Sequence, residues 1–411
     1  MLLKLINFST LQPNLECYID RMKSLFLLTL VVFSGARAAS MAYVKADGVW
    51  LEQNGKATLV KGTKGTQYAV LSPKDGTLVY FVGSAVTYSE DAPSKMNGFI
   101  RKAPYTRAVA LPTPMNSLEM YGYNLEWARD GSYVQAAEYR FDPRLNKVWK
   151  TSDFGPRAAS KTGAVSAWIE DYKTLKVAGG KSKAARAAFS PKNLQAALNV
   201  TQKVLEVENE FYRNASNWWT GDPAVSPDGE AIYFSSNGGG GGGAAGNTSY
   251  ALFKIDSATD RVVALERLKY KEGEGNVGGR LPELQVSPDG KKLLMWSSYH
   301  SSVVENPSIL RVVDLPSSDT VGLIWKPKIP ENKAVDKEFY FTNWVTAACW
   351  LDNNTVALTG TLVDISSFYS DDSTVDIKGP KYPNEFSLYL LDAVTGKIKR
   401  TVKGVGFVSC G

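Results

Sequence analysis

The sequence predicts an all-β fold assembled from a repeated sheet of four strands. A Ser-Pro-Asp-Gly turn stands between two apolar stretches at residues 226–229 and again at 287–290. Looser copies of this turn occur at 71–76, 127–131 and 350–354. A second motif, a strand with an aspartate-rich turn and another strand, follows at 252–262, 310–314 and 388–397. Two hairpins per repeat make a four-stranded sheet, and a radial array of such sheets is a β-propeller.

The turn motif has residue types suited to a tight corner. Proline presets φ for a turn, aspartate bonds nearby backbone, and glycine tolerates positive φ. The flanking stretches, such as 232–234 and 293–296, are apolar without strict alternation. That pattern is typical of strands covered on both faces. Each copy is therefore interpreted as a hairpin in a sheet that packs between neighbouring sheets.

The spacing of the turns predicts five or six four-stranded blades. The turn aspartates are 55, 98, 61 and 63 residues apart, at positions Asp75, Asp130, Asp228, Asp289 and Asp352. Three of these intervals fit one blade each, and the interval of 98 fits one blade with an insert or two short blades. We favour an insert with a helix near 180–215, because Ser190-Pro191 is a typical helix start and Leu194, Leu198, Leu205 and Phe211 recur at roughly helical spacing. The alternative takes 189–193 as a degenerate turn of a sixth blade.

The two ends of the mature chain are expected to meet in one blade. Residues 48–60 form a predicted hairpin whose turn is Gln53-Asn54-Gly55, and residues 405–410 read as one further strand. If this last strand joins the blade of the first hairpin, the ring closes without exposed sheet edges. A single propeller domain is therefore predicted over residues 41–411.

The first 38 residues are interpreted as a leader. Met22-Lys23 and an apolar stretch from 25 to 33 precede Ala36-Arg37-Ala38, the pattern of a signal peptide cleaved after Ala38, with Met22 as the start. The apolar stretch is shorter than the 20 residues or so that span a bilayer. A membrane anchor or a buried helix is the alternative. We expect export to the periplasm or the cell exterior, with no transmembrane span in the mature chain.

Charge and cysteine content narrow the function classes. The chain carries 47 Lys and Arg against 41 Asp and Glu and has no dense basic block, so nucleic-acid binding is unsupported. Cys17 would be lost with the leader, which leaves Cys349 and Cys410 in an oxidising compartment. A disulfide between them and two buried free thiols are both compatible with the sequence.

The turn repeat resembles a known family. The Ser-Pro-Asp-Gly turn, its apolar strands and the later Asp-x-x-Thr-Gly hairpin are similar to the WD-like repeat of TolB-type β-propellers and of prolyl-oligopeptidase-type propeller domains. The resemblance is strongest in 220–300, fair in 65–140 and 340–400, and weak in 155–215. It implies a fold only, because the repeat residues are structural.

Motifs for catalysis or cofactors are weak. Residues 273–278 match G-x-G-x-x-G, but a strand rather than a helix is expected after them, so no dinucleotide site is predicted. His300 is the single histidine, and no nucleophile elbow accompanies it. Asp371, Asp372 and Asp376 could bind calcium but are interpreted as a solvated acidic loop. We expect neither a catalytic residue nor a metal or other cofactor.

One set of residues is a candidate ligand site. The segments leading into the inner strands carry aromatic or large polar residues, and in a propeller these segments meet at one mouth of the central channel. Such residues could stack on and clamp a sugar or a peptide, although packing between blades is the alternative. The set is Tyr123, Trp218, Trp219, Arg280, Asn343 and Trp344.

The function predicted from the sequence is non-catalytic binding or scaffolding. The expected partner is a protein or a glycan at the channel mouth. The alternative from another class is a propeller-type polysaccharide lyase or glycoside hydrolase. The single histidine and the weak catalytic motifs favour the binding module.

Overall fold

The structure is a computed structural model of the chain. It describes residues 40–83, 94–113, 115–120, 125–136, 139–150, 158–171, 173–190, 193, 218–238, 250–267, 283–296, 310–315, 346–360 and 386–411. The chain divides into two compact units, Met1–Ala38 and Ala39–Gly411. The leader prediction lies outside the described residues. Among those that are described, no helix has the length and apolarity needed to cross a membrane.

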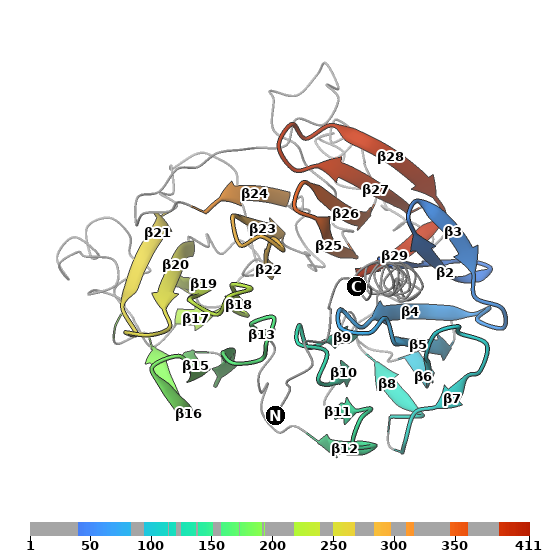
Figure 1. Cartoon of the computed structure of the whole chain (residues 1–411), viewed down its shortest axis with the longest axis horizontal. Helices are drawn as coiled ribbons and strands as arrows, with labels where there is room; N and C mark the ends of the chain where they lie inside the picture. Colours follow the sequence, from blue (N-terminus) through green and yellow to red (C-terminus); the bar gives the residue numbers. More distant parts are fainter. Residues whose placement is uncertain are drawn as a thin grey trace, which may run out of the picture. The chain divides into compact units, whose positions relative to one another are not determined.

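The second unit is an all-β propeller with seven blades, so the prediction of five or six blades is wrong. The described strands form seven antiparallel sheets that follow one another along the chain, except where the ring closes (Figure 1). Sheets of four strands, with short additional strands in blades 2 and 5 and three described strands in blade 6, form the blades.

The strands of the first four blades have the following bounds. Blade 1 contains β29 (Val405–Cys410), β1 (Met41–Lys45), β2 (Gly48–Gln53) and β3 (Lys56–Leu59); blade 2 contains β4 (Thr66–Leu71), β5 (Leu78–Gly83), β6 (Ser94–Arg101), β7 (Val109–Ala110) and β8 (Leu118–Met120). Blade 3 contains β9 (Leu125–Trp127), β10 (Val134–Ala136), β11 (Tyr139–Asp142) and β12 (Lys147–Lys150); blade 4 contains β13 (Ala158–Ala159), β14 (Ser166–Glu170), β15 (Thr174–Gly179) and β16 (Ser182–Phe189).

The remaining strands make up blades 5 to 7. Blade 5 contains β17 (Trp218–Thr220), β18 (Ala224–Val225), β19 (Ala231–Gly238), β20 (Tyr250–Asp256) and β21 (Val262–Arg267); blade 6 contains β22 (Glu283–Val286), β23 (Lys292–Trp296) and β24 (Leu310–Asp314). Blade 7 contains β25 (Ala347–Asp352), β26 (Thr355–Gly360), β27 (Ser387–Asp392) and β28 (Ile398–Lys403).

Blades 1 and 4 explain why the blade count from sequence was too low: the five repeat turns belong to blades 2, 3, 5, 6 and 7, and blade 1 is completed by the closing strand. The case of blade 4 is less obvious. Its first turn is Ser160-Lys161-Thr162-Gly163, which lacks the proline and the aspartate of the repeat. The turn nevertheless forms the same backbone hydrogen bonds as the Ser-Pro-Asp-Gly turn of blade 5: Ser160 N donates to Val165 O at 2.8 Å, as Ser226 N donates to Ala231 O at 2.8 Å. The long interval between Asp130 and Asp228 therefore holds an additional blade.

The predicted helical insert is corrected in its described part. Residues 182–189 form β16, the outer strand of blade 4, rather than a helix. This strand contains four alanines, residues with the highest helix propensity, and its pairing with β15 outweighs that preference. The alternative of an additional blade in this interval is confirmed, but the repeat turn of that blade lies at 160–163 rather than at 189–193. Residues 194–215 lie outside the described part of the chain.

The hydrophobic core lies between adjacent sheets. Phe189 of blade 4 packs against Phe234 and Phe253 of blade 5, with ring centroids 4.7 and 5.4 Å away. Tyr68 of blade 2 meets Phe407 of blade 1 edge to face at 5.6 Å. These side chains are buried, which agrees with strands that are covered on both faces.

The ring is closed by the C-terminal strand, as the sequence predicted. β29 pairs with β1, so blade 1 combines the last strand of the chain with the first three; Figure 1 shows the red β29 in the same blade as the blue strands β2 and β3. The hairpin from β2 to β3 forms the outer half of this blade, and its turn has φ of 51° at Asn54 and 76° at Gly55.

Candidate binding sites at the two ends of the inner strands

The inner strands give the propeller axis two chemically different ends. The first strand of each sheet is the inner one, with β29 in that place in blade 1. We call the end at which the inner strands begin the loop end. The end at which they close into the turns of the repeat is called the turn end. The sequence placed its candidate ligand residues at the loop end.

Most of the predicted ligand residues lie outside the described part of the chain. This holds for Tyr123, Arg280, Asn343 and Trp344. Trp218 and Trp219 belong to β17, which pairs with β19 at the start of the inner strand of blade 5. Next to them, Thr220 Oγ1 donates a hydrogen bond to Lys173 O of blade 4 at 2.8 Å. The structure thus places the backbone of this tryptophan pair at the loop end.

At the turn end, the repeat serine and aspartate hold the corner together. In blade 5, Ser226 Oγ donates to Asp228 Oδ1 at 2.5 Å and accepts from Ala231 N at 2.9 Å. Blade 6 repeats this arrangement with Ser287 and Asp289 at 2.6 Å. Burial raises the pKa of Asp228, but the hydrogen bonds from Ser226 and from the backbone together outweigh it, so the pKa lies below its ordinary value. These carboxylates act in the turns, as the sequence predicted.

The turns of consecutive blades pack directly on each other. A Cβ on Gly131 of blade 3 would lie 2.5 Å from Lys74 Cβ of blade 2. A Cβ on Gly229 of blade 5 would similarly lie 3.2 Å from Ser160 Cβ of blade 4. Both glycines also have positive φ, 66° and 83°, so glycine serves the turn conformation and the close approach together.

Two blades carry a cation where others carry the repeat proline. The backbone hydrogen bonds align Ala128-Arg129-Asp130-Gly131 and Ser160-Lys161-Thr162-Gly163 with the Ser-Pro-Asp-Gly turn at 226–229. Arg129 of blade 3 and Lys161 of blade 4 thus stand at the position of Pro227. The N–H of Lys161, which a proline would lack, donates to Pro227 O at 3.0 Å.

Arg129 reaches across the axis. Its Nη1 lies 3.4 Å from Val225 O of blade 5 and 3.5 Å from Val286 O of blade 6, so the side chain extends past blade 4. It keeps an intermediate exposed surface. Burial lowers the pKa of the Arg129 guanidinium to about 10, and the nearby Glu126 carboxylate raises it to a smaller extent. The group remains a cation at neutral pH.

Other arginines act as structural links. Arg101 donates to Tyr80 Oη at 3.0 Å and to the carbonyls of Lys61 and Tyr105 at 2.9 Å. Arg186 of blade 4 pairs with both oxygens of Asp260 of blade 5, at 2.6 to 3.0 Å. Arg129 differs from them, because within the described residues its hydrogen bonds are only the two long ones to Val225 O and Val286 O, and it has no carboxylate partner within 4.0 Å.

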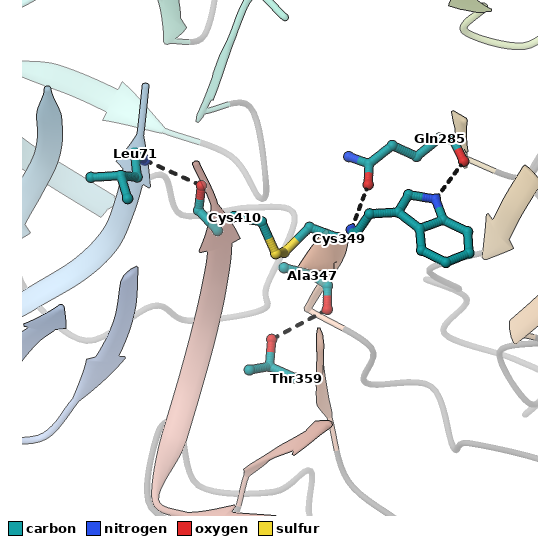
Figure 2. The surroundings of a disulfide bond; sticks show 8 residues. Leu71, Gln285, Ala347, Cys349, Thr359 and Cys410 are labelled. Carbon is teal, nitrogen blue, oxygen red and sulfur yellow. Dashed lines mark hydrogen bonds between the residues drawn. A yellow bond between two sulfur atoms is a disulfide. The ribbon is translucent and has the colours of Figure 1, made fainter. Parts of the chain in front are cut away.

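The seam between blades 7 and 1 has a covalent link. Cys349 of β25 and Cys410 of β29, for which the sequence left a bridge and two thiols open, form a disulfide with Cα atoms 5.8 Å apart (Figure 2). Figure 2 also shows Leu71 N donating to the Ser409 hydroxyl at 3.2 Å, and the Trp350 indole donating to Gln285 O at 2.9 Å. Blades 2, 1, 7 and 6 are thus joined in sequence around this bond.

A bidentate ion pair reinforces the same seam. Arg400 of β28 donates to Glu52 of β2 at 2.9 and 2.6 Å, and Glu52 is buried. Thr346 Oγ1 adds a hydrogen bond to Gly406 O at 2.6 Å.

No metal centre occurs in the described parts of the chain, where no three His, Cys, Asp or Glu side chains gather as ligands. His300, the segment 273–278 and the acidic residues Asp371, Asp372 and Asp376 lie outside the described residues.

The fold defines the class of protein as a β-propeller. No family model matches the chain, and no curated protein matches it. Solved structures similar to it include TolB from Acinetobacter baumannii (TM-score 0.39, 11% identity, 90% of this chain and 80% of that chain).

Two further structures illustrate the range of similar proteins. A protein from Lactobacillus plantarum has a TM-score of 0.43 and 12% identity over 90% of this chain and 98% of that one. An oligogalacturonate lyase in complex with manganese has a TM-score of 0.37 and 11% identity over 89% and 78%. TolB-type propellers are thus among the structural neighbours, in line with the resemblance of the repeat. Similarity at 11–12% sequence identity concerns the fold and does not indicate a function.

The sequence interpretation overlooked Arg129 and Lys161. The signal was present in Trp127-Ala128-Arg129-Asp130-Gly131, where the proline of the repeat is replaced by arginine. Lys161 could not be found in the same way, because the turn of blade 4 was not recognised.

Proposed function

We propose that the protein is an exported, non-catalytic binding or scaffold module that uses the loop end of the propeller axis as its contact surface. The observation that carries this proposal is the use of the repeat carboxylates. Asp228 and Asp289 accept hydrogen bonds that close their turns and keep their pKa below the ordinary value. A general acid needs a pKa nearer to the operating pH. These groups therefore support the fold rather than catalysis.

The proposed contact surface includes Trp218 and Trp219. The start of the inner strand of blade 5 supports this, because it holds two consecutive tryptophans in β17. Tryptophan combines a large apolar face with an N–H donor, which suits stacking on a sugar or on a peptide side chain. Tyr123, Arg280, Asn343 and Trp344 belong to the same proposed surface.

Glycan and peptide arrays combined with an assay for released products test this function. Retention of a glycan or a peptide without any released product is the expected result. Turnover of a polysaccharide would contradict the proposal and favour a lyase or hydrolase.

A double variant tests the surface itself. Trp219→Ala with Trp344→Ala should lower affinity for the retained ligand by at least about tenfold, the effect of losing stacked aromatic side chains. The melting temperature should stay near that of the parent. Trp149→Ala is a matched control, because Trp149 lies in β12, the outer strand of blade 3, and packs against Tyr133 at a centroid distance of 6.3 Å. A melted double variant would indicate packing instead of recognition.

A further inference from the structure

The two cations at the turn end occupy the position that proline holds in the turns of blades 5 and 6. Pro227 and Pro288 stand there in blades 5 and 6, whereas the adjacent blades 3 and 4 have Arg129 and Lys161. Proline is the better turn former at this place. The turns of blades 3 and 4 therefore lack the proline that favours this turn. A positively charged side chain stands in its place in each of them, at the turn end of the axis.

Arg129 is poorly suited to be a structural link. Its bonds of 3.4 and 3.5 Å to Val225 O and Val286 O are longer than the usual 2.9 to 3.0 Å of an N–H···O bond. Its Nε and Nη2 make no hydrogen bond among the described residues. Arg129 is thus a partly exposed cation without a carboxylate partner in the described residues, and charged groups in such unusual surroundings concentrate at functional sites.

The charged groups around the pair determine how it can hold an anion. Lys161 is exposed, and within the described part of the chain its ammonium group has no ion-pair partner. Asp130 and Asp228, the turn carboxylates beside the two cations, are engaged by Ser132 and Ser226 at 2.6 and 2.5 Å. Glu126 is close enough to affect Arg129 but forms no ion pair with it. A hydrogen bond from a serine leaves a carboxylate charged, so these groups offset the two cations. An anion must therefore be held by direct contacts with Arg129 and Lys161 rather than by a net positive charge.

We propose that Arg129 and Lys161 bind the carboxylate group of a ligand at the turn end of the axis. Two N–H groups of a guanidinium match the two oxygens of a carboxylate, and a lysine adds a point charge that needs no fixed geometry. The site lies at the opposite end of the inner strands from the proposed contact surface, so the inference goes beyond the proposed function. Its test is independent of that function.

Titration calorimetry of the full chain at low ionic strength can test the site. The probes are N-acetylglycine, which carries a peptide-type carboxylate, and galacturonate, which carries a sugar-acid carboxylate. N-acetylglycinamide and galactose are their neutral counterparts. We expect the acids to bind with dissociation constants of about 1 mM, typical for one charged group, and the neutral counterparts at least about tenfold more weakly. A preference between the two acids would identify the source of the carboxylate. Equal binding of acids and neutral counterparts would overturn the proposal.

Variants assign the binding to the two cations. Arg129→Gln should weaken binding of the acids about tenfold or more, and Lys161→Gln about threefold. Arg129→Lys keeps the charge but loses the two-point geometry, so it should lie between the parent and Arg129→Gln. Arg107→Gln is the matched control, because it removes one exposed arginine elsewhere. Unchanged affinity in Arg129→Gln would refute the assignment.

A measurement on the parent protein covers the case in which a variant fails to fold. The Nε–Hε resonance of Arg129 should shift in the NMR spectrum as N-acetylglycine or galacturonate is added, because this donor would gain a carboxylate acceptor. N-acetylglycinamide should leave it in place. A resonance that stays unchanged at saturating acid would overturn the proposal irrespective of the variants.

Discussion

At the seam between blades 7 and 1, Arg400 donates to both oxygens of Glu52 at 2.9 and 2.6 Å, beside the disulfide between Cys349 and Cys410. At the turn end, Arg129 reaches two backbone carbonyls at 3.4 and 3.5 Å and has no carboxylate partner in the described residues. Both arginines bridge blades. The seam satisfies its charges internally, which stabilises the ring, whereas the turn end leaves donors for a ligand. The following changes test this difference.

Removal of the disulfide should have the largest effect. Cys349→Ser with Cys410→Ser releases a cross-link between residues 61 apart, and loop entropy predicts a loss of about 4 kcal/mol in the free energy of unfolding. Denaturant titration gives the value, and the parent protein in excess reductant should match the variant. A loss below about 1 kcal/mol would show that noncovalent contacts alone hold the seam.

Breaking the ion pair at the seam should come next. Glu52→Gln leaves Arg400 without its charge partner and should cost about 2 kcal/mol, less than for a fully buried pair because Arg400 is partly exposed. Thermal or urea unfolding measures the loss. Glu170→Gln is the control, since its pair with Lys176 is more exposed and should cost about 0.5 kcal/mol or less. Equal losses would mean that the seam has no special role.

The turn aspartates should give a smaller effect that depends on pH. Asp228→Asn should cost about 1 kcal/mol at pH 7, because hydrogen bonds to a charged acceptor are weakened. The pKa of Asp228 is depressed in the folded state, so this stabilisation is present above the unfolded value of about 3.9 and is lost as the pH falls through the folded value. Urea unfolding between pH 7 and 2 should show the curves of parent and variant converging. Asp171→Asn, an exposed carboxylate on another turn, should follow the parent throughout.

The smallest loss is expected at Arg129. Arg129→Met removes a cation that lacks a carboxylate partner, so the free energy of unfolding should change by about 0.5 kcal/mol or less, or should rise. Arg101→Met, in contrast, leaves one buried and two partly buried acceptors without their donor and should cost about 3 kcal/mol. Differential scanning calorimetry of both variants separates the roles. A similar loss of unfolding free energy in both variants would show that Arg129 is a structural link. The turn end would then not differ from the seam in this respect.

Much of the architecture was predictable because local chemistry is repeated. The Ser-Pro-Asp-Gly turns, the apolar strands and the closing strand 405–410 appear in the sequence and in the structure. Blade 4 was only an alternative in the sequence analysis, because its turn keeps Ser160 and Gly163 but lacks the proline and the aspartate that mark the repeat. Backbone hydrogen bonds can preserve a turn after most of its side-chain signature is gone.

The candidate sites were predictable to a lesser degree. The sequence indicated aromatic residues just before the inner strands as ligand residues. Among these, the structure describes the backbone of Trp218 and Trp219. The sequence provided no reason to select Arg129, whose position in a turn is typical of a solvated charge. Only the long reach to Val225 and Val286, which are 96 and 157 residues away, distinguishes it.

The sequence by itself determined that the chain folds into repeated antiparallel sheets, because turn geometry and strand burial depend on a few neighbouring residues. The tertiary structure decided that seven sheets form the ring, that Cys349 and Cys410 meet, and that Arg129 lies across the axis. These outcomes depend on how many wedges close a circle and on which distant segments then come together. Such contacts between residues far apart in the chain are set by packing of the whole ring, and a local motif carries no information about them.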